Sequence, residues 1–490
     1  MTPNQSKIYT RRFSRFDFSR FDLSRLGGAA TLVLALSGCA TFSDDGGFGS
    51  VETATRSALD LQASWLKNEQ DRESAQAKVK QLLSNTLNAE TTMQIALSNN
   101  PRLQAEYANL GISEADLVQA GRLPNPGFSF AKNSGGGSQE IERGLHFNIM
   151  AILTMPVRVG IETRRFEAAR LDAVAATINT ALEARAAYFE ALAAKQSTTY
   201  FRQVLASAEA SRDLMRRMTR VGNSSRLQLA REQLFHSEAS AALAQALQRE
   251  AAARESLVQI LGLWGEQTAF RLPERLPDLP DTAQQIENIE QSAIEQRLDI
   301  RRSRHSLDGL ADNLGLTKAT RFINVLEAGP AQVRERGEAV RDGYEVSLEI
   351  PVFDWGGARV AKAEAIYMQA VEQLRATAIN ARSQVRQAYH NYRTTHDVAK
   401  HYRDEIVPLR KRISEENLLR YNGMLIGVFE LIADAREQVR SVSAYVDALR
   451  AYWVADTHLQ SAMLTNAGAN TGGMASAAAT MQSAAQGGGH

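Results

Sequence analysis

The stretch IETRRFEAARLDAVAATINTALEARAAYFEALAAKQSTTYFRQVLASAEASRDLMRRMTRV, residues 161–221, decides the fold class of this chain. It contains neither proline nor glycine, it is rich in Ala, Arg, Glu and Gln, and Gly160 and Gly222 border it. These residue types favour a helix and glycine ends one, so the stretch predicts a single continuous helix. At 1.5 Å per residue this helix is about 90 Å long. A return helix to about Gly262 completes a helical hairpin.

The same pattern recurs 201 positions further along, where Gly222 meets Gly423. The second long helix is predicted over residues 362–421 with a kink at Pro408, because proline disrupts a helix interior. A duplication of this length indicates two copies of one structural unit. We interpret the chain as two structural repeats, residues 90–285 and 286–465, with helical hairpins at about 160–263 and 358–464.

Each long helix is preceded by a segment with strand periodicity. Apolar residues alternate with more polar ones over 145–153 and, most cleanly, over 344–350. We predict strand hairpins at about 127–156 and 320–353, with a polar loop that begins at Gly329. Glu345, Ser347 and Glu349 lie on the polar side and are candidates to face a lumen.

The strand lengths favour a membrane barrel over the alternative, a small soluble sheet packed on helices, because a tilted spanning strand needs about 9–11 residues. Four strands cannot close a barrel, and open edges in lipid leave backbone groups unpaired. If these strands span a membrane, the protein must therefore oligomerise.

The N-terminus is typical of a targeting segment. Five arginines precede a short apolar run that ends in Leu36-Ser37-Gly38-Cys39, which resembles a bacterial lipobox. We expect residues 1–38 to be a lipoprotein signal peptide and Cys39, the one cysteine of the chain, to carry lipid. The alternative is an ordinary signal peptide with an incidental cysteine. An aspartate directly after this cysteine would resemble a signal for retention in the inner membrane. The residue there is Ala40, which favours the outer membrane.

The two flanking regions are predicted to lie outside the folded repeats, and the net charge argues against a nucleic-acid-binding protein. Residues 39–89 are predicted to be a lipid-anchored tether and helix, and residues 466–490 a disordered, low-complexity tail. Without the signal peptide the net charge changes from +1 to about −3, which provides no basic footprint for nucleic acid.

Candidate catalytic or metal-binding residues are not indicated. His390, His396 and His401 share one helix, but their spacing suits no common ligand pair, so we expect solvated side chains. There is no phosphate-binding glycine loop and no nucleophile elbow. The sequence thus predicts no enzyme, no cofactor and no metal site.

Several motifs together resemble the TolC family of bacterial outer-membrane efflux factors, in its lipid-anchored branch. The resemblance covers about residues 90–465 and rests on the lipobox and on the following motifs: Asn100-Pro101-Arg102-Leu103, Gly121-Arg122-Leu123-Pro124-Asn125-Pro126, Pro351-Val352-Phe353-Asp354-Trp355-Gly356-Gly357, Arg420-Tyr421-Asn422-Gly423 and Leu431-Ile432-Ala433-Asp434-Ala435-Arg436.

The resemblance implies a mainly α protein with a small β part. Long α-helical coiled-coil hairpins and four membrane β-strands per protomer would assemble into a homotrimeric α/β-barrel channel. The channel would sit in the outer membrane of a Gram-negative bacterium, anchored in lipid and extending into the periplasm. It would passively conduct substrate from a periplasmic adaptor (membrane fusion) protein and an inner-membrane pump to the cell exterior. The alternative function is a periplasmic adaptor or a structural coiled-coil lipoprotein.

The resemblance also assigns roles to the hairpin turns. The turns form the channel tip in the family, which makes these residues candidate adaptor contacts: Gly222, Asn223, Ser224, Gly423, Met424 and Leu425. Glu430 and Asp434 lie four residues apart on one helix face and are a possible periplasmic gate. The alternative for this acidic pair is a solvated outer face or an ion pair with a neighbouring arginine.

Overall fold

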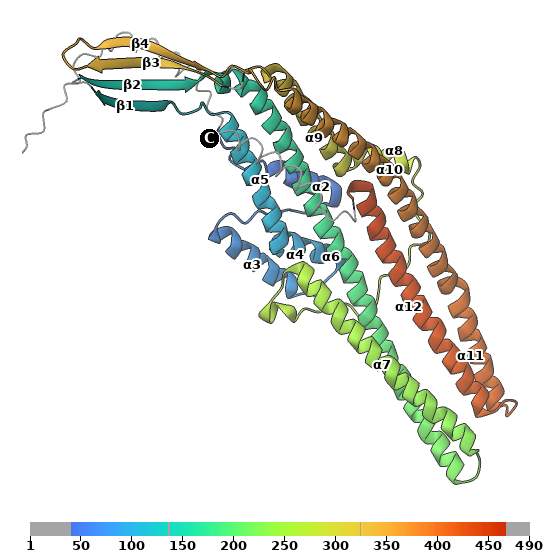
Figure 1. Cartoon of the computed structure of the whole chain (residues 1–490). Coiled ribbons are helices and arrows are strands. Elements are labelled where there is room, and N and C mark those ends of the chain that lie inside the picture. Colours follow the sequence, from blue (N-terminus) through green and yellow to red (C-terminus); the bar gives the residue numbers. More distant parts are fainter. Residues whose placement is uncertain (1–40, 136–137, 324, 467–490) are drawn as a thin grey trace, which may run out of the picture. The chain divides into compact units, whose positions relative to one another are not determined.

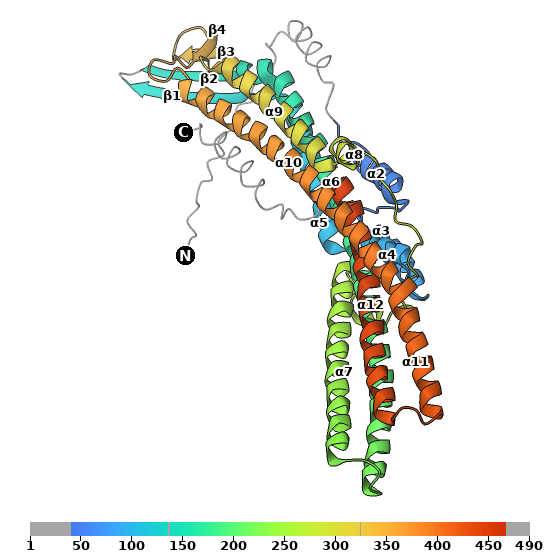
Figure 2. The same cartoon turned by 90° about the vertical axis from the view of Figure 1, so that its right-hand side faces the viewer.

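The computed structural model describes residues 41–135, 138–323 and 325–466, and the described residues from Phe42 to Asn466 belong to one unit. The predicted signal peptide, Cys39 and residues 467–490 of the predicted tail lie outside the described residues. Figures 1 and 2 show long helices that run from a small sheet at one end to two helical turns at the other. Within the described ranges, no helix has the length and apolar character needed to cross a membrane.

The secondary structure is mainly helical with one four-stranded sheet, as predicted. In chain order the elements are α2 (Gly49–Leu59), α3 (Glu69–Leu83), α4 (Ala89–Asn99), α5 (Pro101–Ala120), β1 (Gly127–Gly135), β2 (Ser138–Asn148), α6 (Ile149–Arg220), α7 (Arg226–Leu261), the 3-10 helix η1 (Gly265–Thr268), α8 (Ile289–Gln296), α9 (Leu298–Thr320), β3 (Leu326–Glu335), β4 (Arg341–Leu348), α10 (Gly357–His401), the π turn η2 (Tyr402–Ile406), α11 (Val407–Asn422) and α12 (Val428–Leu464).

The first helical hairpin consists of α6 and α7. Helix α6 has 72 residues and begins at Ile149, so the predicted strand over 127–156 is wrong beyond Asn148. The Asn148 side chain accepts a hydrogen bond from the Ala151 N–H at 2.7 Å and so caps the helix start. Helix α7 ends at Leu261, followed by Gly262 in the left-handed conformation, as expected for a C-terminal glycine.

The second hairpin is interrupted where the sequence predicts a kink. Helix α10 gives way to the π turn η2, and Pro408 lies at the start of α11. Proline has no N–H for the carbonyl four residues earlier, and a π turn accommodates one missing bond. The irregularity expected from Pro408 is therefore present. Helix α12 then returns to Leu464, the residue at which the second hairpin is predicted to end.

The four strands form an antiparallel sheet in the order β1-β2-β3-β4. The prediction of a polar loop from Gly329 is wrong, since Gly329 and Pro330 lie inside β3 and pair with Glu345 and Tyr344 of β4. The chain turns at 336–340 instead. Glycine is required at 329, because a Cβ there would overlap the Leu145 carbonyl oxygen of the neighbouring strand. A glycine and a proline normally indicate a turn, and here that local signal misled the prediction.

The segment 42–48, predicted to be part of a tether, is docked on the helices. The Ser43 N–H donates to the buried Glu114 carboxylate of α5 at 2.7 Å. Gly47 has a φ of +76° and a Cβ at this position would meet the Phe166 ring at 2.6 Å. The segment is therefore packed against α5 and α6, and the tether prediction is wrong for these residues.

The main hydrophobic core lies where α6 packs on α12. Phe189 and Trp453 stack with ring centroids 5.2 Å apart, and the Arg185 guanidinium contacts the Asp456 carboxylate at 2.7 Å. Burial raises the pKa of the Asp456 carboxyl above its ordinary value, and the nearby Arg185 guanidinium offsets only part of this rise. These contacts join the long helices of the first and second hairpins into one core.

The segment that links the two repeats is held against the second helical hairpin. Trp453 Nε1 donates to the Pro277 carbonyl at 3.1 Å and Arg403 Nη1 donates to the Leu279 carbonyl at 2.9 Å. His396 Nε2 lies 2.9 Å from the Pro280 carbonyl oxygen, and the ring is only 3% exposed. The expectation that His396 is solvated is therefore wrong, because a loop distant in sequence covers it.

Candidate channel surfaces

The sheet has one apolar and one polar face. Alternation along the strands and the register together assign each residue to a face. The apolar face carries these exposed side chains: Phe128, Phe130, Leu145, Phe147, Tyr344, Val346 and Leu348. The polar face carries His146, Asn148, Glu140, Glu142, Glu327, Glu335, Glu345 and Ser347. Among the described residues, β1 and β4 each pair on one side only.

The sequence-predicted lumen candidates fall partly on this polar face. Glu345 and Ser347 belong to β4 and share it. Glu349 lies one residue beyond the end of β4, although its N–H still donates to the Val325 carbonyl at 3.3 Å. A sheet with such faces suits an apolar solvent on one side and water on the other.

The two hairpin turns have the same backbone conformation. Their equivalent residues are 202 positions apart, however, and not 201 as the sequence repeat predicts. At the first turn Gly222 has a φ of +80° and the Asn223 N–H donates to the Met218 carbonyl at 2.9 Å. At the second turn the left-handed residue is Met424, with a φ of +58°, and the Leu425 N–H donates to the Arg420 carbonyl at 2.8 Å. Gly222 therefore corresponds to Met424 and not to Gly423. Met424 and Leu425 are 93% and 78% exposed.

This register predicts opposite effects of substitution at the two turns. The left-handed conformation costs a residue with a side chain about 1 kcal/mol relative to glycine. Gly222→Ala should therefore destabilise the first turn and Met424→Gly should stabilise the second, each by about 1 kcal/mol. Hydrogen exchange of amides in the two tips measures these local stabilities.

Gly423→Ala is the matched control, because Gly423 has a φ of −78° and a Cβ there meets its neighbours at ordinary distances of 3.5 Å or more. Destabilisation by Gly423→Ala as large as that by Gly222→Ala would contradict the register, because alanine is compatible with the φ of Gly423.

The predicted gate residues differ in their surroundings. Glu430 is exposed, whereas Asp434 is only 8% exposed and its Oδ2 atom has no hydrogen-bond partner among the described residues. The two carboxylates thus share a helix but not an accessible surface within the protomer. No ion pair to Asp434 is present in the described part of the chain.

A different acid forms the ion pair near the tips. Glu232 of α7 is buried, accepts a hydrogen bond from Ser211 Oγ at 2.8 Å and pairs with Arg436 of α12 at 2.9 Å. The Arg436 guanidinium also lies 4.4 Å from the centre of the Phe235 ring. The two hairpins of the protomer are therefore joined by a buried polar contact, which the sequence did not predict.

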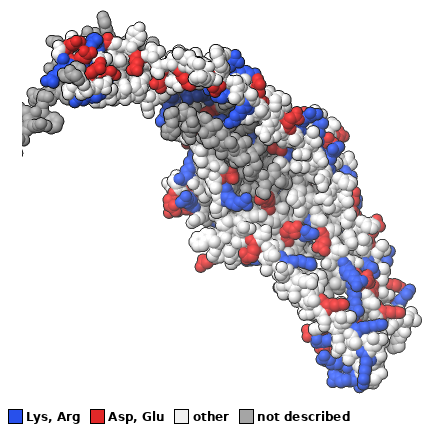
Figure 3. Space-filling view, in the orientation of Figure 1, with Lys and Arg blue, Asp and Glu red and all other residues white. Residues whose placement is uncertain are grey.

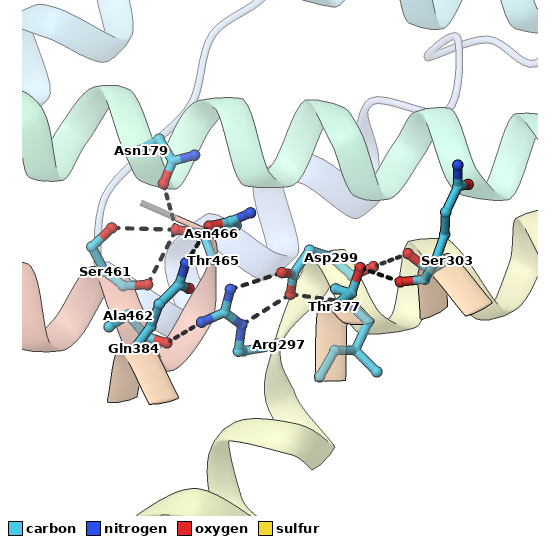
Figure 4. Close-up of polar contacts among 12 residues, drawn as sticks. Asn179, Arg297, Asp299, Ser303, Thr377, Gln384, Ser461, Ala462, Thr465 and Asn466 are labelled. Atoms are coloured by element: carbon cyan, nitrogen blue, oxygen red, sulfur yellow. Dashed lines mark hydrogen bonds and ion pairs between the residues drawn. The ribbon is translucent and has the colours of Figure 1, made fainter. Parts of the chain in front are cut away.

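A buried arginine holds the end of the second hairpin (Figure 4). Arg297 is fully buried; its Nε and Nη2 atoms donate to the two Asp299 oxygens at 3.0 and 2.7 Å, and Nη1 donates to the Ala462 carbonyl at 2.9 Å. In the first repeat, Asn100 Nδ2 donates in the same way to the Ile260 carbonyl at 2.8 Å. In both halves, a side chain just before a helix therefore donates to a carbonyl that the last turn of another helix leaves unpaired. Asn100, before α5, does so for α7, and Arg297, before α9, does so for α12.

The fold is that of the TolC-like outer-membrane channels. In particular, the chain is similar to CusC, with 18% identity, 80% of this chain and 92% of that chain covered, and a TM-score of 0.63. It is also similar to the outer-membrane protein VceC from Vibrio cholerae, with 14% identity, coverage of 81% and 98%, and a TM-score of 0.64.

A third similar structure is the open state of the Neisseria gonorrhoeae MtrE outer-membrane channel, with 17% identity, coverage of 76% and 88%, and a TM-score of 0.64. By sequence, no protein-family model and no curated protein matches the chain.

Proposed function

We propose that this protein is the outer-membrane channel of a tripartite efflux or secretion system. The observation that carries the proposal is the two-faced sheet with unpaired edges, placed at one end of long helical hairpins. Such a sheet buries its apolar face in lipid only if the edges pair with other copies, because lipid offers no hydrogen-bond partners. The shared fold with known outer-membrane channels supports a homotrimer with a twelve-stranded barrel.

The helical tips are the proposed docking surface for the adaptor and, through it, for an inner-membrane pump. Figure 3 shows basic side chains gathered at the end of the α6–α7 hairpin. The end of α6 and the start of α7 carry the exposed Arg216, Arg217, Arg220 and Arg226. The second turn carries the exposed apolar pair Met424 and Leu425. An adaptor hairpin that fits this surface carries acidic residues around an apolar contact.

The proposed periplasmic gate is a ring formed by Glu430, with Asp434 behind it. Three copies around one axis would place like charges in a narrow aqueous throat, where they attract cations and repel anions. We expect Glu430→Gln to lower the cation selectivity of single channels in a planar bilayer. Asp434→Asn should have a smaller effect, because its carboxylate is covered within the protomer.

Glu416→Gln is the control for the gate, since Glu416 is an exposed acid on the neighbouring helix α11. The same selectivity in the wild type and Glu430→Gln would place Glu430 on the outside of the helical tube. Absence of any channel in the wild-type recordings would contradict the proposed function itself.

The lipid anchor on Cys39 is supported by the docking of the following segment. Ser43 contacts Glu114 of α5, and α5 leads directly into the loop before β1. Ser43 is only four positions after Cys39 in the sequence, so the proposed anchor is followed by no long linker before the docked segment begins.

Metabolic labelling with a radioactive fatty acid tests this anchor. The wild type should incorporate label and Cys39→Ser should not, because the thiol is the acylated group. Ser43→Cys in the Cys39→Ser background is the control, since it restores a cysteine outside the lipobox. Labelling of Cys39→Ser at the wild-type level would exclude Cys39 as the lipid-bearing residue, and labelling of the variant with Ser43→Cys would show that the lipobox position is not required.

A further inference from the structure

Three cations interrupt the apolar face of the sheet near its hairpin turns. Lys132 of β1 pairs with Ile141 of β2, and Ile141 pairs with Arg334 of β3, so the three residues form one row across the sheet. Arg143 lies two residues further along β2 toward the helices and pairs with Phe130 and Gln332. Neighbouring strands are about 4.8 Å apart, which places the three cations within roughly 10 Å of one another on one face.

These cations have no acidic partner in the described residues. Asp342 lies on the same face, but its carboxylate accepts a hydrogen bond from Gln332 Nε2 at 2.9 Å. Glu335 lies on the opposite face, where it pairs with Arg341. Lys132 and Arg334 are exposed and Arg143 is partly exposed. Three cations and the single Asp342 carboxylate therefore share this part of the face, and an anion would stabilise the net positive charge that remains.

The position of the cluster limits what that anion is. A Lys or Arg on the lipid face of a barrel costs about 2–4 kcal/mol at the bilayer midplane and almost nothing at the interface. We therefore expect the three cations to lie at the level of the lipid headgroups and not in the hydrocarbon core. The cations are near the end of the sheet that points away from the helices (Figure 1). In a membrane-spanning sheet, their headgroup layer is therefore the one on the opposite side of the membrane from the helices.

We propose that Lys132, Arg143 and Arg334 form a binding site for the phosphate groups of a phosphorylated glycolipid in the outer leaflet. The inference rests on the proposed function, because only a spanning sheet brings these residues to a lipid surface. Arginine and lysine are suited to phosphate, and two phosphates on one headgroup match a cluster of this width better than one. The neighbouring Phe130 and Phe128 provide the apolar contact for the acyl chains.

Native mass spectrometry of the detergent-solubilised protein tests the site, with diphosphoryl lipid A, monophosphoryl lipid A and phosphatidylcholine as probes. The wild type should bind diphosphoryl lipid A most tightly and phosphatidylcholine least. In the variant Lys132→Gln/Arg143→Gln/Arg334→Gln, the affinity for diphosphoryl lipid A should fall roughly a hundredfold, as expected for three lost cations near a charged surface.

The control variant Arg202→Gln/Arg249→Gln/Lys362→Gln removes the same charge from exposed helical positions and should bind lipid A like the wild type. Retention of lipid A affinity by the sheet variant, or equal loss in both variants, would overturn the proposed site. Circular dichroism of both variants excludes loss of folding as the cause.

Conductance in a phosphatidylcholine bilayer separates this site from the channel function. The sheet variant should conduct like the wild type, because its three side chains lie on the face opposite to the lumen. If neither protein conducts while the lipid A preference persists, the proposed function fails and the lipid site stands. If both conduct but the preference is absent, only the lipid site fails.

Discussion

Replacement of Arg297 by leucine should destabilise the protein by about 3–5 kcal/mol, the usual effect of removing one partner from a buried ion pair. The substitution leaves the half-buried Asp299 carboxylate without its guanidinium and the Ala462 carbonyl without its donor. Both groups lose protein partners without gaining full access to water, so the unmet hydrogen bonds add to the lost charge interaction. Urea unfolding of the detergent-solubilised protein, followed by circular dichroism, measures the effect.

Three further variants make this test specific. Arg297→Lys should have an intermediate effect, because an ammonium cannot donate to both carboxylate oxygens and the carbonyl in the same geometry. Asn100→Ala, the counterpart in the first repeat, should cost only about 1–2 kcal/mol, since its hydrogen bond is uncharged. Arg304→Leu changes an exposed arginine of the same helix and should be nearly neutral. Wild-type stability of Arg297→Leu would show that the end of α12 needs no such support.

Val346→Arg should lower the stability of the inserted protein by about 2–4 kcal/mol, the cost of a lipid-facing arginine near the bilayer midplane. Val346 lies on the apolar face, 57% exposed, between rows of apolar residues that include Leu348 and Tyr344. The guanidinium would have to lose its hydration there or distort the bilayer.

Ser347→Arg is a closely matched control, because Ser347 is the next residue of β4 and lies on the polar face. It should assemble normally, since an arginine in an aqueous lumen stays hydrated. The measurement is the fraction of heat-stable oligomer on gels, together with urea unfolding in phosphatidylcholine vesicles. Equal tolerance of both arginines would mean that the sheet does not span a membrane.

The candidate site could be predicted only where the relevant signal is local. Alternation along β4 assigned Glu345 and Ser347 to a polar face, and the register of the sheet agrees. The tips were located correctly, but the alignment of Gly222 with Gly423 was wrong by one residue. The second long helix ends one residue later, at Asn422, and shifts the left-handed position to Met424. Glycine is the usual residue there, so the sequence alone favours the wrong position.

The residues that join distant parts of the chain were missed. Arg297 was not singled out in the sequence, because the Ala462 carbonyl that it binds lies 165 positions away. Glu232 and Arg436 lie 204 positions apart, and nothing near either residue indicates the other. The burial of Asp434 was likewise not apparent, because its four-residue spacing from Glu430 describes one helix and not what packs against it.

The sequence by itself determined the long helices, their pairing into two repeats and the two faces of the sheet. These features follow from the spacing of apolar residues, from composition and from duplication, all of which act over a few turns or one strand. Tertiary structure alone decided that Gly329 and Pro330 lie within a strand, that His396 is buried and that Arg297 holds the end of α12. The physical reason is that each of these depends on a group far away in sequence, such as the Leu145 carbonyl, the Pro280 loop or the last turn of α12.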